Sequence, residues 1–300
     1  MPKKVNIFTY SEKGRRKTNQ DCIGKSCFCI KGKSVVLLTV ADGMGGYRGG
    51  DIASKKAVDM FHARMKKHFK ESISMEKIKE SLKNIYQEIN KHIYMESREN
   101  RDLADMGTTL TSLVLVDSKY IIANIGDSRA YSVKEEEIFQ ITEDHSAQAE
   151  AEKEGLYTPM EIAKMPYKYA LTRNLGNKEQ IDVDIFPKKG FFYTDKNEII
   201  MLLTDGVTNK VSELELYEEV LSSRDLKQAA HNIGKLAYQK GSKDNISIAL
   251  VEIGSLKRNK YLAGRYQSKL KKKARFFRRH IFVFLSLLVF IFIFLLIFIF

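Results

Sequence analysis

Eight stretches of this 300-residue chain have the apolar or alternating pattern of β-strands, and they occur in groups. They cover residues 22–30, 34–41, 110–116, 120–125, 130–133, 181–186, 198–204 and 246–253. Helices are expected at 58–69, 75–93 and 225–240, the first two from apolar residues three and four positions apart. Because the strands do not alternate one by one with helices, the pattern favours an α+β fold of packed sheets with helices outside. It argues against a doubly wound parallel sheet.

The last twenty residues, 281–300, contain one polar residue, Ser286, among Ile, Leu, Val and Phe. About 20 helical residues, each rising about 1.5 Å, cross a hydrocarbon core of about 30 Å. A partial Phe/Ile alternation also fits a strand, but a strand would leave unpaired backbone groups in lipid, so we expect a transmembrane helix. A lipid-anchor signal would require export, and the N-terminus has no apolar signal-peptide core.

The net charge of +13 is concentrated just before this tail. Residues 256–280 contain eleven Lys and Arg and no acidic residue, so the first 255 residues carry only +2. A nucleic-acid binder would need a basic domain, and this distribution argues against one. Basic residues beside a span stay in the cytoplasm, which predicts a single-pass membrane protein with a cytoplasmic domain. The basic residues either bind anionic lipid or only set this orientation.

The sequence therefore predicts a domain at 1–255, a basic juxtamembrane linker at 256–280 and a transmembrane helix at 281–300. Within the domain, residues 144–176 have weak strand signals, and they form either an insertion over a site or a surface excursion.

Three cysteines, at positions 22, 27 and 29, are too few and too clustered for a disulfide framework. A metal pair would need a second pair or a nearby His, so we expect small core residues instead.

Five aspartates stand at the ends of the β-like stretches. Asp42, Asp127 and Asp205 follow such stretches, and Asp21 and Asp244 precede them. Each alone is typical of a turn or a cap. If the strand ends converge, however, the carboxylates repel one another unless cations neutralise them. Because no His or Cys accompanies them, Mg²⁺ or Mn²⁺ is the expected cation.

Such a cluster is typical of a two-metal hydrolase, in which ions about 3.5 to 4 Å apart activate a shared water against phosphorus. Gly43 lets the chain turn sharply after Asp42, so that a backbone carbonyl can reach the same cation. A glycine-rich phosphate loop is the alternative, but the Lys-Ser/Thr pair of a P-loop does not follow. Arg16 either grips phosphate oxygens or belongs to a solvated basic loop.

Seven short motifs occur in the order and spacing of a known family. They are RKTNQD at 16–21, ADGMGG at 41–46, MGTT at 106–109, IGDSR at 125–129, LTRNLG at 171–176, TDG at 204–206 and KDNI at 243–246. Together they resemble the metal-dependent protein Ser/Thr phosphatases of type 2C, the PPM family, in their bacterial form. Over about residues 6–253, the resemblance implies a four-layer α-β-β-α sandwich of two mainly antiparallel sheets, with a dinuclear Mn²⁺ or Mg²⁺ site at one end.

The resemblance also implies the metal ligands, which are Asp21, Asp42, Gly43, Asp127, Asp205 and Asp244. Asp42 bridges both ions, and Gly43 offers its carbonyl oxygen. The second ion is held by Asp21, Asp205 and Asp244.

Other roles follow from the same resemblance. Asp127, with Asp205, matches a position that contributes to a third ion in bacterial relatives, and Arg16 binds the substrate phosphate. The catalytic pair is thus Arg16 and Asp42, and residues 144–176 match the family's flap, a region for substrate selectivity. A hydroxide bridging the two ions attacks directly, so no covalent phosphoenzyme is implied.

Two positions depart from the family pattern. Gln20 stands where the family often has Glu, and a neutral amide adds no charge to the metal site, so a lower metal affinity is expected. Met44 stands where some relatives have a His that protonates the leaving group, and a thioether cannot do so. Water is then expected to protonate the leaving alkoxide.

The sequence thus predicts a membrane-anchored hydrolase that removes phosphate from Ser or Thr of cytoplasmic or membrane proteins, with a cognate Ser/Thr kinase as a partner. The first alternative is a catalytically silent phosphoprotein-binding module tethered to the membrane, and Gln20 alone supports it. The second is a membrane-surface scaffold in which the basic linker acts. The complete set of metal aspartates favours the enzyme.

Overall fold

The structure is a computed structural model that describes residues 5–45, 49–195, 197–258, 264 and 266. Its strands form two antiparallel sheets that pack face to face. The first sheet has the order β1 (Val5–Glu12), β12 (Ile246–Gly254), β11 (Asn197–Leu203), β7 (Arg129–Val133) and β8 (Ile138–Gln140). The second has the order β10 (Phe192–Tyr193), β6 (Lys119–Ile125), β5 (Leu110–Val116), β3 (Lys33–Met44) and β2 (Asp21–Ile30). Two short strands join it, with β4 (Gly107–Thr108) on β3 and β9 (Asp184–Phe186) on β6.

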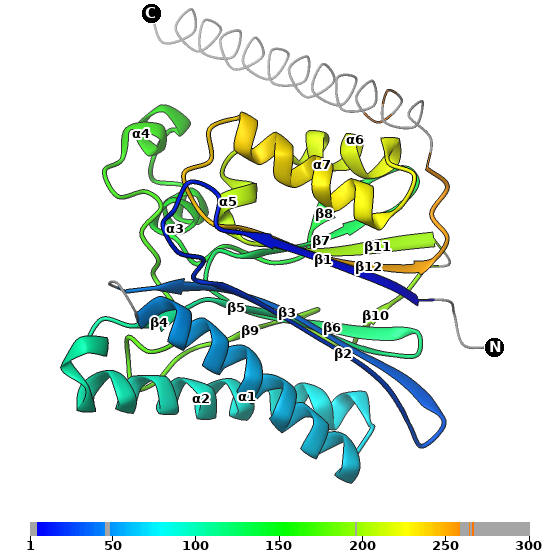
Figure 1. The fold of residues 1–300 in the computed structure, drawn as a ribbon, viewed down its shortest axis with the longest axis horizontal. Helices are drawn as coiled ribbons and strands as arrows, with labels where there is room; N and C mark the ends of the chain where they lie inside the picture. The colour runs from blue at the N-terminus through cyan, green and yellow to red at the C-terminus, as the bar shows by residue number, and fades with distance from the viewer. Residues whose placement is uncertain (1–4, 46–48, 196, 259–263, 265, 267–300) are drawn as a thin grey trace, which may run out of the picture.

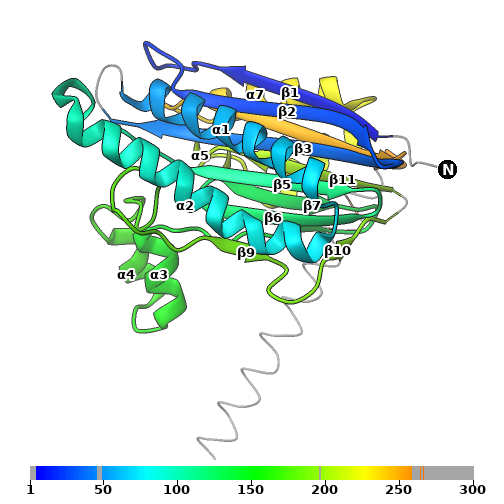
Figure 2. The same cartoon turned by 90° about the horizontal axis from the view of Figure 1, so that it is seen from below.

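Two pairs of helices cover the outer faces of the sheets (Figures 1 and 2). The second sheet is covered by α1 (Gly49–Glu71) and α2 (Met75–Glu99), and the first by α6 (Glu213–Ser222) and α7 (Leu226–Gln239). The remaining helices are short: η1 (Arg101–Leu103), α3 (Ala147–Glu154), α4 (Pro159–Lys164) and α5 (Asp205–Thr208). This arrangement confirms the predicted α+β fold with two antiparallel sheets between helices.

The strand β3 shows why its sequence reads as a continuous apolar run. Val35 and Leu37 pack against the α1 and α2 side, whereas Leu38 and Val40 face the core between the two sheets. A strand buried on both faces needs apolar residues at every position instead of alternate ones. Central strands of both sheets share this property, which made them easy to recognise.

The strand predicted just after the flap is shorter than expected. Of residues 181–186, only Asp184–Phe186 form a strand, because side chains of α2 bind the preceding backbone. The Ile181 amide donates to Gln87 Oε1 at 3.2 Å, and Asn90 Nδ2 donates to the Lys178 carbonyl at 2.8 Å. The strand β1 and the helix α6 were not predicted at all.

The expectation that the cysteines are core residues was wrong for two of them. Cys27 and Cys29 are exposed, and Cys22 is half-buried. The strand β2 lies at the edge of its sheet, and Phe28, between the two exposed cysteines, packs on Phe69 of α1. Cys27 and Cys29 therefore point away from the helix layer. All three thiols are free.

Residues 144–176 contain α3 and α4, which project from one end of the sandwich (Figures 1 and 2). A β-bridge between Ser146 and Leu171 closes the base of this flap.

Beyond β12, the described chain stays on the domain, where Leu256 is buried and Arg258 lies 2.8 Å from Glu252. No helix among the described residues has the length and apolarity needed to span a bilayer. The predicted transmembrane helix at 281–300 lies outside the described residues.

Candidate active site

A cavity of ≈ 710 Å³ opens where the predicted site residues converge. It is lined by six of the seven predicted site residues: Arg16, Asp42, Gly43, Asp127, Asp205 and Asp244. The seventh, Asp21, pairs with Asp42 across the β2–β3 ladder. The structure therefore brings together side chains that the sequence spreads over more than two hundred positions.

Both sheets contribute aspartates to this cluster. Asp205 stands two residues after the end of β11, and Asp244 two residues before β12, its neighbour in the first sheet. Asp21 and Asp42 come from the second sheet. Thr204 Oγ1 joins the two groups by donating to Asp21 Oδ2 at 2.9 Å. The strand ends thus converge as the sequence pattern predicted.

Thr109 fixes the backbone of Asp42. The Asp42 amide donates to Thr109 Oγ1 at 2.9 Å, and the Thr109 amide donates back to the Asp42 carbonyl at 2.9 Å. Thr109 Oγ1 also lies 2.9 Å from Ser128 Oγ, beside Asp127. Thr109 lies in the MGTT motif, but sequence reasoning assigned it no role.

The loop that carries Arg16 is held by Asn245. Asn245 Nδ2 donates to the carbonyls of Lys13 and Thr18, each at 2.9 Å, and Asn245 Oδ1 accepts from the Gln20 amide. These bonds place Arg16 at the edge of the cavity. Its guanidinium forms a two-bond fork with Asp244, at 2.9 and 2.7 Å.

Glycine is required at two positions where backbones approach closely. A Cβ on Gly43 would lie 2.0 Å from the Gly50 carbonyl oxygen, and one on Gly206 would lie 1.9 Å from that of Asn245. Any side chain would force these segments apart. Gly43 therefore keeps the chain after Asp42 close to the start of α1, and Gly206 keeps the chain after Asp205 close to the segment of Asp244 and Asn245.

Burial makes this cluster electrostatically costly. Desolvation, with repulsion from neighbouring carboxylates, raises the pKa of Asp21 to about 7 and that of Asp127 to about 8. The same causes raise the pKa of Asp42 well above its ordinary value, and that of Asp205 also rises. Several negative charges cannot remain together here without cations.

The chemistry of the donors fits a hard divalent cation. Asp21 Oδ1 and Asp205 Oδ1 are buried and have no hydrogen-bond partner within the described part of the chain. All the candidate ligands are oxygens, the ligand type that Mg²⁺ and Mn²⁺ prefer. Among the described residues, no three His, Cys, Asp or Glu side chains form a complete metal site. Two of the carboxylates instead accept from protein groups, Asp244 from Arg16 and Asp21 from Thr204.

The two residues that depart from the family pattern, Gln20 and Met44, also line the cavity. Three further lining residues, Arg98, Asp105 and Tyr169, were missed by sequence reasoning. Arg98 lies near the end of α2, Asp105 in a loop and Tyr169 in the flap. None of these three residues stands at the end of a predicted strand, which is the pattern that identified the aspartates.

The chain matches the family model described as protein phosphatase 2C over residues 10–246. A serine/threonine phosphatase, stp, of Listeria monocytogenes serotype 4b is 37% identical over 216 residues, which are 72% of this chain and 84% of that protein. The solved serine/threonine phosphatase of S. agalactiae superposes with a TM-score of 0.74 and 29% identity, covering 83% of this chain and 100% of that one.

A further solved structure is the catalytic domain of the phosphatase PstP, in complex with two manganese ions. It has a TM-score of 0.67 and 24% identity, and the match covers 84% of this chain and 99% of that one. The family match extends over most of the chain and includes every predicted site residue. The chain therefore belongs to the protein phosphatase 2C family and is a hydrolase of the serine/threonine phosphatase type.

Proposed function

We propose that this phosphatase removes phosphate from phosphoserine and phosphothreonine of proteins by using two Mn²⁺ or Mg²⁺ ions. The observation that carries the proposal is the cluster of five aspartates, four of which line one cavity while the fifth, Asp21, pairs with Asp42. Burial and mutual repulsion raise the carboxyl pKa values of four of them, Asp21, Asp42, Asp127 and Asp205. Two of their oxygens, Asp21 Oδ1 and Asp205 Oδ1, have no hydrogen-bond partner among the described residues. Such a cluster is stable with its carboxylates ionised only when cations neutralise it. When bound, the ions supply an activated water and neutralise the phosphate charge.

The chain's own residues then have separate tasks. Asp42 would hold both ions, and the Gly43 carbonyl would be a further ligand. Asp21, Asp205 and Asp244 would hold the second ion. Asp127, with Asp205, would hold a third ion. The PstP domain was solved with two manganese ions, which supports the pair.

Arg16 would bind the substrate phosphate. The Arg16 side chain lies at the cavity edge and is 57% exposed, and two of its guanidinium nitrogens donate to the carboxylate oxygens of Asp244. A phosphate presents a similar pair of oxygens, so the same fork can accept it. Met44 has no proton to give, and water must therefore protonate the leaving alkoxide.

The direct test is phosphate release from a phosphoserine or phosphothreonine peptide by the purified full chain, with Mn²⁺ or with a chelator. We expect release only with the metal, and none from Asp205→Ala. Asp59→Ala is the matched control, because Asp59 is an exposed aspartate on α1 that pairs with Lys55. A folded wild-type chain that binds phosphopeptides without turnover would instead support the silent binding module.

We further propose that residues 281–300 anchor the enzyme in a membrane, with the catalytic domain in the cytoplasm. The support is the sequence alone, an apolar stretch of membrane length preceded by eleven basic residues. The test compares the full chain with a chain ending at residue 280 in membrane fractions washed with carbonate. Recovery of both chains in the soluble fraction would contradict the anchor.

Phosphorylated Ser/Thr proteins are the proposed substrates, and a cognate kinase remains a prediction from the family resemblance. The basic linker 256–280 either binds anionic lipid or only sets orientation. Replacement of Lys271, Lys272 and Lys273 by Gln should reduce contact with anionic vesicles without releasing the anchor, if lipid binding is its role.

A further inference from the structure

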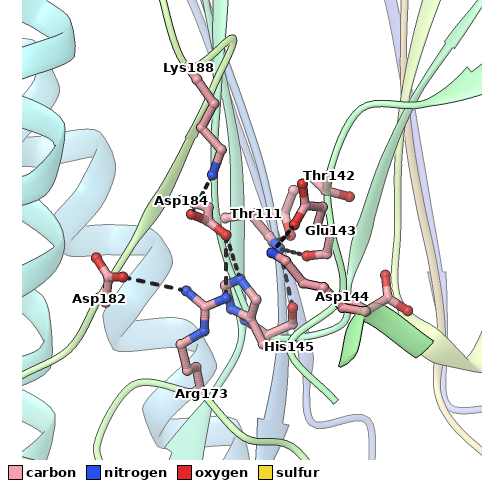
Figure 3. A network of polar contacts seen from close by, with 12 residues as sticks. Thr111, Thr142, Glu143, Asp144, His145, Arg173, Asp182, Asp184 and Lys188 are labelled. Carbon is pink, nitrogen blue, oxygen red and sulfur yellow. Dashed lines mark hydrogen bonds and ion pairs between the residues drawn. The ribbon is translucent and has the colours of Figure 1, made fainter. Parts of the chain in front are cut away.

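A second polar cluster lies at the base of the flap, and Figure 3 shows its side chains around His145 and Asp184. We define the His145 cluster as Gly126, His145, Arg173, Asp184 and Lys188, which the interactions below connect. The His145 side chain is completely buried. Gly126 directly precedes Asp127, and Arg173 lies in the LTRNLG motif near the end of the flap. The proposed function assigns no task to these residues.

The two ring nitrogens of His145 contact different parts of the molecule. The Gly126 amide donates to Nδ1 at 3.1 Å, so Nδ1 must be the unprotonated nitrogen. The proton is then on Nε2, which lies 3.1 Å from Asp184 Oδ2 and donates to it. One neutral imidazole therefore connects the loop before Asp127 to a carboxylate on β9.

The backbone of His145 adds two bonds at the same place. Its amide donates to the Gly126 carbonyl at 3.1 Å, and its carbonyl accepts from the Thr172 amide at 3.0 Å. Gly126 and Thr172 belong to the Asp127 loop and to the end of the flap. His145 itself lies at the start of the flap, so it joins both flap ends to that loop.

Besides His145, two charged groups hold Asp184. Arg173 Nη2 lies 3.3 Å from Asp184 Oδ2, and Lys188 Nζ lies 2.8 Å from Oδ1. The pairing of β9 with β6 places Asp184 opposite Asn124. The strand therefore presents a fixed acceptor to His145, and Arg173 attaches the far end of the flap to the same acceptor.

The loop of Gly126 and Asp127 is closely packed and has little room to move. Gly126 has φ +109°, and a Cβ there would lie 2.4 Å from Thr109 Cγ2. Asn124 Nδ2 donates to the carbonyls of Gly126 and Glu143, each at 3.2 Å. Arg129, two positions after Asp127, pairs with Asp144 at 2.7 Å. A displacement of His145 is thus transmitted to Asp127.

We propose that His145 and Asp184 are positioning residues of the phosphatase reaction, which hold the Asp127 carboxylate and the two flap ends in one arrangement. The proposal rests on the proposed function only in giving Asp127 a task at the metal site. It implies that the flap and the Asp127 loop do not move independently.

Two variants of His145 separate its two side-chain bonds. In His145→Asn, the amide oxygen can occupy the place of Nδ1 and accept from Gly126. In His145→Gln, the amide nitrogen can occupy the place of Nε2 and donate to Asp184. The first readout is hydrogen exchange of the Gly126 amide in the full chain, measured without metal or substrate. We expect exchange about tenfold faster in His145→Gln and near the wild-type rate in His145→Asn.

The second readout is activity with Mn²⁺. We expect His145→Asn to retain at least about tenfold more kcat than His145→Gln on p-nitrophenyl phosphate, at equal thermal stability. Equal exchange and equal kcat in the two His145 variants would overturn the proposal. Because exchange is measured without turnover, it decides the positioning role even in a chain that proves inactive.

Asp184→Asn tests the proposal if the His145 variants fail to fold. Asp182→Asn is its matched control, because Asp182 also faces Arg173, at 3.8 Å, but is 79% exposed and has no bond to His145. We expect Asp184→Asn to lower kcat/KM for a phosphopeptide about tenfold, and more than for p-nitrophenyl phosphate, since the flap is the expected region of substrate selectivity. Equal values for the two variants would contradict the coupling of the flap to the site.

Discussion

The His145 cluster and the cavity aspartates differ in how carboxylate charge is neutralised. In the His145 cluster, three side chains donate to the Asp184 carboxylate: His145, Arg173 and Lys188. Despite the partial burial of Asp184, these donors hold its pKa at about 2. Around the cavity, Arg16 pairs with Asp244, but burial and mutual repulsion raise the carboxyl pKa values of the other aspartates. The charge of Asp184 is thus neutralised within the chain, whereas for the cavity aspartates we propose that cations do so.

Removing one charge from the cavity should have the largest effect. Asp42→Asn should lower kcat/KM by about 10³-fold, because Asp42 is expected to contact both ions. The same change should raise the unfolding free energy of the metal-free chain by about 1 kcal/mol, since a repelling buried carboxylate is lost. Denaturant unfolding in a chelator, beside steady-state kinetics in Mn²⁺, measures both effects. Lower metal-free stability in Asp42→Asn would contradict the electrostatic account.

Removing the cation at the cavity edge should have a smaller effect. Arg16→Ala should lower kcat/KM about 30-fold, because the fork that binds phosphate is lost. Arg15→Ala is the matched control, since Arg15 lies over the Tyr238 ring, 4.9 Å from its centroid, and does not line the cavity. That control should change kcat/KM by less than about twofold. Equal losses in both variants would indicate a general effect of positive charge.

The charge pairs of Asp184 in the His145 cluster should make the free energy of unfolding depend on pH in the acid range. The ordinary pKa of Asp in an unfolded chain is about 3.9, and the folded value is about 2. Asp184 therefore stabilises the fold above about pH 4, and this contribution is lost as the pH falls through about 2. Asp184→Asn should cost on the order of 1 kcal/mol at pH 7, discounted for partial exposure, and less at pH 2.5. A cost that does not change with pH would exclude the charge contribution.

The parts of the molecule that could be predicted from the sequence depend on local pattern. Continuous apolar runs marked the strands buried on both faces, and the aspartates at their ends marked the cavity. The edge strand β1 was missed because it alternates weakly, with partly buried residues along most of its length. Cys27 and Cys29 were misplaced because the sequence does not tell which face of an edge strand is covered.

Other parts depend on contacts between distant positions. His145 accepts from Gly126, nineteen positions earlier, and donates to Asp184, thirty-nine positions later. Gln87 and Asn90 bind the backbone near residue 180 and shorten the expected strand there. No periodicity marks such pairs. The LTRNLG motif was recognised without any indication that its Arg173 attaches the flap to β9.

The most direct test of the difference between the two clusters is thermal unfolding of the full chain with and without Mn²⁺. A cation that binds only the folded state raises the unfolding temperature by mass action. We predict a clear rise for the wild type and for Asp184→Asn, and little or none for Asp42→Asn. No rise in the wild type, or the same rise in Asp42→Asn, would contradict the claim that the cavity aspartates are the cation site.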